Sequence, residues 1–373
     1  MSQTPINNEL DNLTEEQRSV LHSLRSSRMV LPILLGLGVV GFLLWRQLTA
    51  HPESFDKINW TGETFAWIFA AFVLLVLRHL AFSLRMMILS QGHFSFRKCV
   101  ELIFIFEFSL CITPTTLGGS AVSLFVMTQE KLSAARTTTI VIYKVVLDTL
   151  FFVGTLPLLY LMSGARMIRP DMNYFGDLDW RARIFYLSYI GMACYGAFFF
   201  YGLFVNPILI KNALTGLTRL PLLNRWHERA EKLGSEIILA SHDMRNLKWQ
   251  QHFAAFVATI TAWTCKFFLI SCLIYGITTT PLGFWRETLL YSRLESMFVI
   301  LAFSPSPGGA GFVEATFYPF LSDFLPNTGV AIVVAFIWRF MSYYAYLAAG
   351  AIIVPNWIRK VFLKNLKDKQ AEK

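Results

Sequence analysis

FSPSPGGAGFVEATF (residues 303–317) is the stretch of sequence on which the predicted topology of this chain depends. It lies between two apolar segments, yet it holds two prolines, three glycines and a glutamate. Proline removes a backbone donor and glycine weakens a helix interior, so these residues form a poor continuous helix. The stretch therefore predicts a break in the backbone between apolar helices.

Apolar residues dominate the composition. They make up 55 % of the 373 residues, charged residues make up 15 %, and soluble domains typically carry ~25 % charged residues. The mean hydropathy is +0.49. The block MVLPILLGLGVVGFLLW (29–45) is long enough to cross a hydrocarbon core of about 30 Å, and no small-residue cleavage site follows it. We predict an all-α polytopic membrane protein in which 29–45 is a retained span.

The net charge of +9 has a topological interpretation. In a membrane protein, excess Lys and Arg mark cytoplasmic loops and contacts with anionic head groups, so we predict no nucleic-acid partner. The five cysteines are scattered and the seven histidines have no ligand spacing, which predicts no metal site. Walker A, GxSxG and HExxH motifs are absent, so we expect no cofactor, no catalytic residues and no enzyme activity.

The distribution of basic residues restricts the topology. Basic residues gather before residue 29, at 85–98, at 206–250 and at 359–373, and the positive-inside rule places all four stretches in the cytoplasm. Eight simple spans would put 206–250, with its seven Lys and Arg residues, on the outer side. The apolar segments in question are 29–45, 64–84, 101–127, 137–162, 183–205, 252–277, 287–303 and 329–354.

Two re-entrant hairpins remove this conflict. If the chain turns back at CITPTTLGGSA (111–121) and again at SPSPGGAG (304–311), all basic stretches lie on one side. About six full spans then combine with two hairpins that enter from opposite faces. This pattern resembles the inverted repeats of transporters, and chance similarity of two Pro/Gly turns is the alternative. The residues predicted to break the helices are Pro114, Gly118, Gly119, Pro305, Pro307, Gly308, Gly309 and Gly311.

The predicted organisation has three parts. Residues 1–28 form a cytoplasmic N-terminal segment, 29–354 form the transmembrane domain, and 355–373 form a basic cytoplasmic tail. Within the domain, 206–250 places leucines roughly on one face among Lys and Arg. This is typical of amphipathic helices under anionic lipid, and a solvated loop is the alternative. We expect a multi-pass protein of the cell (inner) membrane with both termini in the cytoplasm.

Ionisable residues inside the apolar segments form the candidate site. A charge at the bilayer centre costs about 2.5–3.5 kcal/mol on insertion scales, so such residues are usually paired or functional. Lys144 and Asp148 share a helix face and can pair, which has a purely structural interpretation. In the functional interpretation, which we prefer, cations bind a lipid phosphate and acids serve as counter-ions or proton carriers. The predicted head-group and translocation residues are Glu107, Lys144, Asp148, Glu314 and Arg339.

Three further cations receive a simpler interpretation. Arg78, Arg85 and Lys266 lie near enough to predicted span ends that we expect them to snorkel to the membrane interface. Glu295 also lies in an apolar segment, and the sequence assigns it no specific role.

Several motifs together resemble one family. SPSPGGAGFVEA (304–315) and TPTTLGGSAVS (113–123) resemble the two signature motifs of the lysylphosphatidylglycerol synthase transmembrane-region, or flippase-like, family. YKVVLD (143–148) and WRF (338–340) are similar to the segments that carry its cations, and the resemblance covers 29–360. The first motif departs from the family pattern at Thr115, Thr116, Ser120 and Ser123.

The resemblance implies lipid translocation and not lipid synthesis, because no cytosolic transferase domain follows the last span. We expect a flippase- or scramblase-like protein whose partners are membrane lipids, either anionic phospholipids or lipid-linked glycans. A homo-oligomer or a biosynthetic enzyme partner fits the same pattern. The alternatives are a non-catalytic accessory subunit of a lipid or glycan biosynthesis enzyme, and a membrane-embedded transferase or hydrolase that uses Asp148 or Glu314 on a lipid-linked substrate.

Overall fold

The computed structural model describes residues 60–112, 115–174, 176, 179–219, 227–279, 283–303 and 312–371, together with Trp45 and Thr49. Every regular element in these residues is a helix. The helices are α5 (Gly62–Leu89), α6 (Phe96–Ile112), α7 (Thr115–Gln129), α8 (Ala134–Ser163), η1 (Gly164–Met167), α9 (Trp180–Phe200), η2 (Tyr201–Val205), α10 (Pro207–Leu217), α11 (His227–Arg245), α12 (Trp249–Thr278), α13 (Phe284–Leu301), α14 (Phe312–Leu321), α15 (Thr328–Arg339), η4 (Phe340–Tyr344) and α16 (Ala345–Ala371).

Five helical stretches in the described residues are long and apolar enough to cross a bilayer. They agree with the predicted spans 64–84, 137–162, 183–205, 252–277 and 329–354, so the prediction of an all-α polytopic membrane protein is confirmed. The predicted span 29–45 lies outside the described residues. The five stretches are Gly62–Leu89, Ala134–Met167, Trp180–Val205, Trp249–Thr278 and Thr328–Val361.

Polar caps determine where four of these five stretches begin. The side chains of Thr61, Ser133, Asp179 and Asn327 each accept a hydrogen bond from a backbone N–H in the first helical turn. Such a cap satisfies a donor that has no partner within the helix. The last stretch is not a uniform α-helix, because the π-helical turn η4 follows directly after Arg339.

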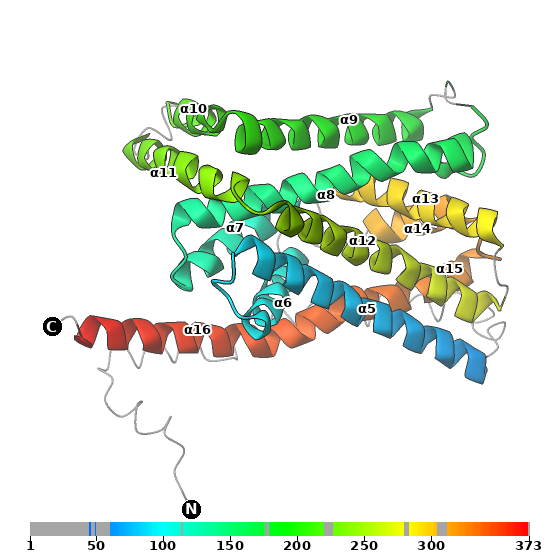
Figure 1. Cartoon of the computed structure of the whole chain (residues 1–373). Coiled ribbons are helices and arrows are strands. Elements are labelled where there is room, and N and C mark those ends of the chain that lie inside the picture. Colours follow the sequence, from blue (N-terminus) through cyan, green and yellow to red (C-terminus); the bar gives the residue numbers. More distant parts are fainter. Residues whose placement is uncertain are drawn as a thin grey trace, which may run out of the picture.

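The long helices lie roughly along one direction and form a bundle. In Figure 1, α5 and α12 run side by side, with α8 and α9 on one side of them and α16 on the other. The pair α10 and α11 lies at the end of the bundle to which the C-terminal part of α16 also extends (Figure 1). The described parts of the basic stretches 206–250 and 359–373 therefore share one end of the bundle, in agreement with the charge distribution.

Helices α6 and α7 form a hairpin that starts and finishes at that same end. The Lys98 Nζ atom near the start of α6 lies 2.6 Å from Glu130 Oε1 just after α7. Trp357 of α16 donates from Nε1 to the same carboxylate at 2.5 Å. Gly118 and Gly119 lie inside α7, so the helix interruption precedes these two glycines and they do not break the helix. The predicted breaking residue Pro114 lies outside the described residues.

Helices α13 and α14 form a second hairpin at the opposite end. The Nη2 atom of Arg286 in the first turn of α13 donates to the backbone oxygen of Asp323, after α14, at 2.9 Å. The turn between the two helices, 304–311, lies outside the described residues and includes the remaining predicted helix-breaking residues, which are Pro305, Pro307, Gly308, Gly309 and Gly311. Entry of the two hairpins into a bilayer as re-entrant elements stays a prediction.

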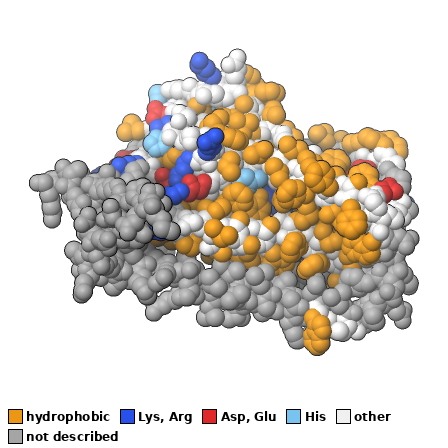
Figure 2. All heavy atoms as spheres, turned by 90° about the horizontal axis from the view of Figure 1, so that it is seen from below, with side chains coloured by type: hydrophobic (Ala, Val, Ile, Leu, Met, Phe, Trp, Pro, Cys, Tyr) orange, Lys and Arg blue, Asp and Glu red, His pale blue; other side chains and the backbone are white. Residues whose placement is uncertain are grey.

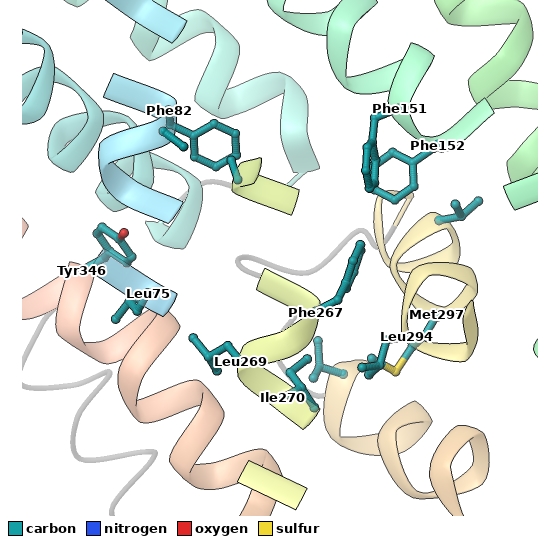
Figure 3. Close-up of a cluster of buried hydrophobic side chains, with 14 of the residues drawn as sticks. Leu75, Phe82, Phe151, Phe152, Phe267, Leu269, Ile270, Leu294, Met297 and Tyr346 are labelled. Atoms are coloured by element: carbon teal, nitrogen blue, oxygen red, sulfur yellow. The ribbon is translucent and has the colours of Figure 1, made fainter. Parts of the chain in front are cut away.

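Much of the described surface is apolar. Large hydrophobic side chains such as Phe69, Leu158 and Leu187 are more than half exposed. Figure 2 shows hydrophobic side chains over most of the described part of one face. A soluble monomer rarely exposes a contiguous apolar patch of this extent, so the surface agrees with contact to lipid. The buried core includes an aromatic group formed by Phe151 and Phe152 of α8 and Phe267 of α12 (Figure 3).

Several helix contacts in the described residues depend on glycine, and two of them are especially close. A Cβ atom on Gly350 of α16 would lie 2.2 Å from the Phe108 ring of α6, and one on Gly196 of α9 would lie 2.1 Å from Thr149 of α8. In lipid the hydrophobic effect does not drive helices together, so small residues at the contact permit the close van der Waals packing that does.

We expect Gly350→Val to destabilise the protein by about 1–3 kcal/mol, because the larger side chain overpacks the contact between α16 and α6. Chemical denaturation in detergent micelles measures this change. Gly154→Val is the matched control, since no atom lies within 4 Å of a Cβ built on Gly154 in α8. An equal loss of stability in both variants would contradict the packing role of Gly350.

The two ends of the bundle should face opposite sides of the membrane. Leu239 of α11 is 71 % exposed and Tyr174, in the connection between α8 and α9, is 66 % exposed. In a cysteine-free background, we expect an impermeant thiol reagent to label Tyr174→Cys on intact cells and Leu239→Cys only after permeabilisation, because basic loops stay inside. Labelling of both positions from the same side would disprove the arrangement.

Candidate functional site

Helix α5 presents two arginines to the interior of the bundle. Arg78 and Arg85 are seven residues apart, about two helical turns, so they lie on the same face. Their exposed fractions are only 6 % and 3 %. The prediction that they snorkel to the interface is therefore wrong, because both side chains reach carboxylates inside the bundle.

Arg78 joins α5 to α6. Its Nη2 atom lies 2.6 Å from Glu107 Oε1, and its Nη1 atom donates to the Tyr346 hydroxyl oxygen at 3.3 Å. The neighbouring His79 ring lies 3.1 Å from the same hydroxyl through Nδ1 and 3.2 Å from the Val100 backbone oxygen through Nε2. Glu107, a predicted site residue, is thus the counter-ion of Arg78.

Arg85 joins α5 to α8 and α12. Its Nη1 atom lies 2.5 Å from Asp148 Oδ1 and 3.1 Å from the Thr259 hydroxyl oxygen. The Nε1–H of Trp263 also donates to Asp148 Oδ1, at 3.0 Å. Asp148 therefore pairs with Arg85 and not with Lys144, which the sequence spacing had offered as its partner.

Two lysines lie beside these ion pairs without a carboxylate of their own. Lys144 of α8 and Lys266 of α12 are half-buried, and neither forms an ion pair with a described residue. The Lys266 Nζ atom lies over the Trp263 and Phe298 rings, 4.6 Å and 4.2 Å from their centroids. Both lysines interact electrostatically with Glu107 and Asp148. For Lys266 too, the snorkelling prediction is wrong.

The charges of this cluster do not balance. With both lysines protonated, the four cations Arg78, Arg85, Lys144 and Lys266 outnumber the carboxylates of Glu107 and Asp148 by two among these six described side chains. A buried charge that is not neutralised is costly in a low-dielectric interior. An anion bound between the lysines would supply the missing negative charge.

The comparisons with known proteins identify the family. The sequence model of the family described as lysylphosphatidylglycerol synthase TM region matches residues 29–350 of this chain. The chain belongs to that family. A UPF0104 membrane protein from Archaeoglobus fulgidus is 23 % identical over 350 residues, which cover 88 % of this chain and 99 % of the relative. No solved structure matches the chain.

The structure describes two further predicted site residues of this family member only in part. Arg339, at the end of α15, is 6 % exposed, and its guanidinium lies over the Tyr343 ring, 4.8 Å from the centroid. Glu314 belongs to α14, and its side chain lies outside the described part of the structure. The proposed contact between Glu314 and Arg339 thus stays a prediction.

The sequence contained a signal for the residues that were missed. Arg78 and Arg85 recur at a spacing of seven residues in a single apolar segment, which places both on one helix face. Two acids in other apolar segments, Glu107 and Asp148, matched them in number. Tyr346, Thr259 and Trp263 carried no comparable signal, because tyrosine, threonine and tryptophan are common in membrane helices.

The described cluster has the donors of an anion site and lacks the ligands of a metal site. Groups of three or more His, Cys, Asp or Glu side chains that could hold a metal ion are absent from the described residues. The two lysines offer ammonium groups, which bind phosphate as point charges. The ammonium groups of the two lysines are therefore the donors that this cluster offers to an anionic ligand.

We expect Arg85→Met to lower the free energy of unfolding by about 3–5 kcal/mol, since it leaves the Asp148 carboxylate without its ionic partner. The double variant Arg85→Met/Asp148→Leu should recover part of this loss, because it removes both charges. Denaturant titration in detergent measures both. Arg97→Met, at an exposed position near the start of α6, should change stability by less than about 0.5 kcal/mol. A double variant that is no more stable than Arg85→Met would contradict direct pairing of Arg85 with Asp148.

Proposed function

We propose that this chain moves an anionic or glycan-linked lipid between the leaflets of the inner membrane, without covalent chemistry. The observation that supports this most strongly is that, among the six described side chains of the cluster, cations outnumber carboxylates by two. Purely structural ion pairs would balance, and an excess of buried cations favours a negatively charged ligand. Membership of the lysylphosphatidylglycerol synthase TM region family agrees with a role that involves lipid.

In the proposed mechanism the arginines and the lysines have different tasks. Arg78 and Arg85 hold Glu107 and Asp148 and so fix α5, α6 and α8 around the path. Lys144 and Lys266 bind the phosphate of the head group, while the acyl chains stay in lipid beside the apolar surface. Helix α7 begins at Thr115, and the N-terminus of a helix favours an anion.

The proposed orientation follows from charge. The end of the bundle that carries α10, α11 and the C-terminal part of α16 faces the cytoplasm, because the basic stretches gather there. The hairpin of α6 and α7 then enters from the cytoplasmic side and the hairpin of α13 and α14 from the outer side. Both hairpins then reach the proposed lipid path inside the bundle.

Reconstitution into vesicles with a panel of labelled lipids tests the proposal. The panel should hold zwitterionic, anionic and lipid-linked glycan species, and the assay should follow the leaflet distribution of each. We expect faster exchange of an anionic or glycan-linked lipid than in protein-free vesicles. An unchanged distribution of every lipid, with folded protein verified by circular dichroism, would count against transport. Copurification of a stoichiometric biosynthetic enzyme would then favour the accessory role.

We expect Lys144→Gln and Lys266→Gln each to lower the initial rate of lipid exchange about tenfold or more, because each removes a charge-assisted contact to the head group. The rate in vesicles of one lipid composition measures this effect. Lys232→Gln, at an exposed position of α11, is the control and should exchange lipid at the wild-type rate. Equal rates in all three variants would exclude the two lysines from the path.

A further inference from the structure

A buried ionisable residue also lies outside the cation cluster. Glu295, in the middle of α13, has an exposed fraction of 0 %. Its Oε1 atom makes a hydrogen bond with the Thr155 hydroxyl of α8, and its Oε2 atom has no hydrogen-bond partner. Among the described residues, no Lys or Arg forms an ion pair with this carboxyl group.

The hydrogen bonds at Thr155 can be completed by a protonated Glu295 carboxyl group. The Thr155 hydroxyl lies 2.6 Å from the Phe151 backbone oxygen, which can only accept a hydrogen bond. A hydroxyl group has one hydrogen to donate. If that hydrogen goes to Phe151, the hydrogen in the contact with Glu295 must come from the carboxyl group. A carboxylate without a cation in such an apolar site would also be costly.

The surroundings of Glu295 offer no alternative neutralising charge in the described residues. Tyr189 of α9 and Tyr291 of α13 are the titratable groups that interact with it. From α12, Lys266 lies over the Phe298 ring, one turn further along α13. Arg293 of α13 is engaged by Asp323 at 2.5 Å. From α8, the contact is the uncharged Thr155.

Helix α8 connects this carboxyl group with the cation cluster. Thr155 and Asp148 are seven residues apart, so they lie on one face of α8 about 10 Å from each other along the axis. Phe151 and Phe152 of α8 and Phe267 of α12 fill the space between the two levels (Figure 3). The electric field of the cation cluster therefore reaches Glu295 through a layer of buried aromatic side chains, where charges are weakly screened.

We propose that Glu295 is a proton-binding site that couples lipid movement to a proton gradient. This inference rests on the proposed function and adds its energy source. A proton suits the site better than a metal cation, because one carboxyl and one hydroxyl group provide too few oxygen ligands for Na⁺ or Mg²⁺. The carboxyl group takes up one proton from the aqueous phase on one side and releases it to the other as the path changes its access.

The sign of the coupling follows from the charges. When Lys144 and Lys266 are protonated, the excess of cations in the cluster favours an ionised Glu295, and an anionic head group bound to the lysines cancels that positive field. Anion binding therefore favours the protonated carboxyl group, and by reciprocity protonation favours anion binding. Lipid and proton should move in the same direction.

Vesicles with an imposed pH gradient test the coupling. We expect wild-type protein to accumulate the transported lipid in the leaflet facing away from the acidic side, and to stop at equal distribution when the gradient is dissipated. Glu295→Gln, which keeps the shape and stays neutral, should equilibrate the lipid but ignore the gradient. Glu287→Gln, in the first turn of the same helix, is the matched control and should respond as wild type does.

Three outcomes of the vesicle experiment decide against the proposal. One is a Glu295→Gln variant that responds to the pH gradient as the wild type does. Another is a wild type driven by a Na⁺ gradient at constant pH. The third is a wild type that equilibrates lipid identically with and without the pH gradient, which overturns the proton site while leaving the proposed function intact.

Infrared spectroscopy of the purified protein provides a readout that is independent of transport. We expect a carboxylic C=O band at neutral pH that is lost in Glu295→Gln and shifted in frequency in Thr155→Val, which removes the hydroxyl partner. The band should grow when an anionic lipid is added. If the wild type moves no lipid at all, the proposed function fails. If the carboxylic band also stays unchanged in Thr155→Val and after lipid is added, the proton site is overturned as well.

Discussion

The described fold depends on how the two buried arginines of α5 are neutralised. A charge inside an apolar bundle is tolerated only with a partner, and removal of one partner costs several kcal/mol. Arg78 reaches Glu107 of α6, and Arg85 reaches Asp148 of α8 as well as Thr259 of α12. A single helix therefore fixes the depth of three others. In lipid this matters more than in water, since the apolar faces of helices gain little by leaving the acyl chains.

Ion pairs of the same kind also hold the two hairpins, as their predicted re-entrant position would require. Irregular backbone survives at membrane depth only when protein or a polar path surrounds it. Glu107 lies on α6, so its pairing with Arg78 holds one arm of the first hairpin against α5. Contacts of Glu130 with Lys98 and Trp357 close that hairpin at the end where α6 begins and α7 finishes. The second hairpin is held by Arg293, whose Nη1 atom contacts both Asp323 and the Phe320 backbone oxygen.

Sequence reasoning predicted the helices better than the partners. Apolar blocks mark spans because length and hydropathy are local properties, and five of the six predicted spans correspond to described helices. Pairing is not local. Lys144 and Asp148 are neighbours on α8, but Asp148 pairs with Arg85, which is 63 residues away in the sequence. Distance from a span end could not distinguish a snorkelling Arg85 from a buried one, because the outcome depends on whether another helix offers a carboxylate. Gly118 and Gly119 were expected to break a helix, yet glycine only weakens one, and α7 continues through both.

The division between paired arginines and unpaired lysines bears on how a ligand could leave the site. At 4 Å and an effective dielectric constant of about 20, each cation attracts a unit negative charge by about 4 kcal/mol. Four free cations would hold a phosphate so tightly that release would limit transport. Because Glu107 and Asp148 already occupy the arginines, the field on a bound phosphate is that of about two charges. Lysine also binds as a single point charge, without the bidentate geometry that makes arginine–phosphate contacts persistent. The carboxylates thus leave a moderate positive field at the lysines, which suits the reversible binding that the proposed transport requires.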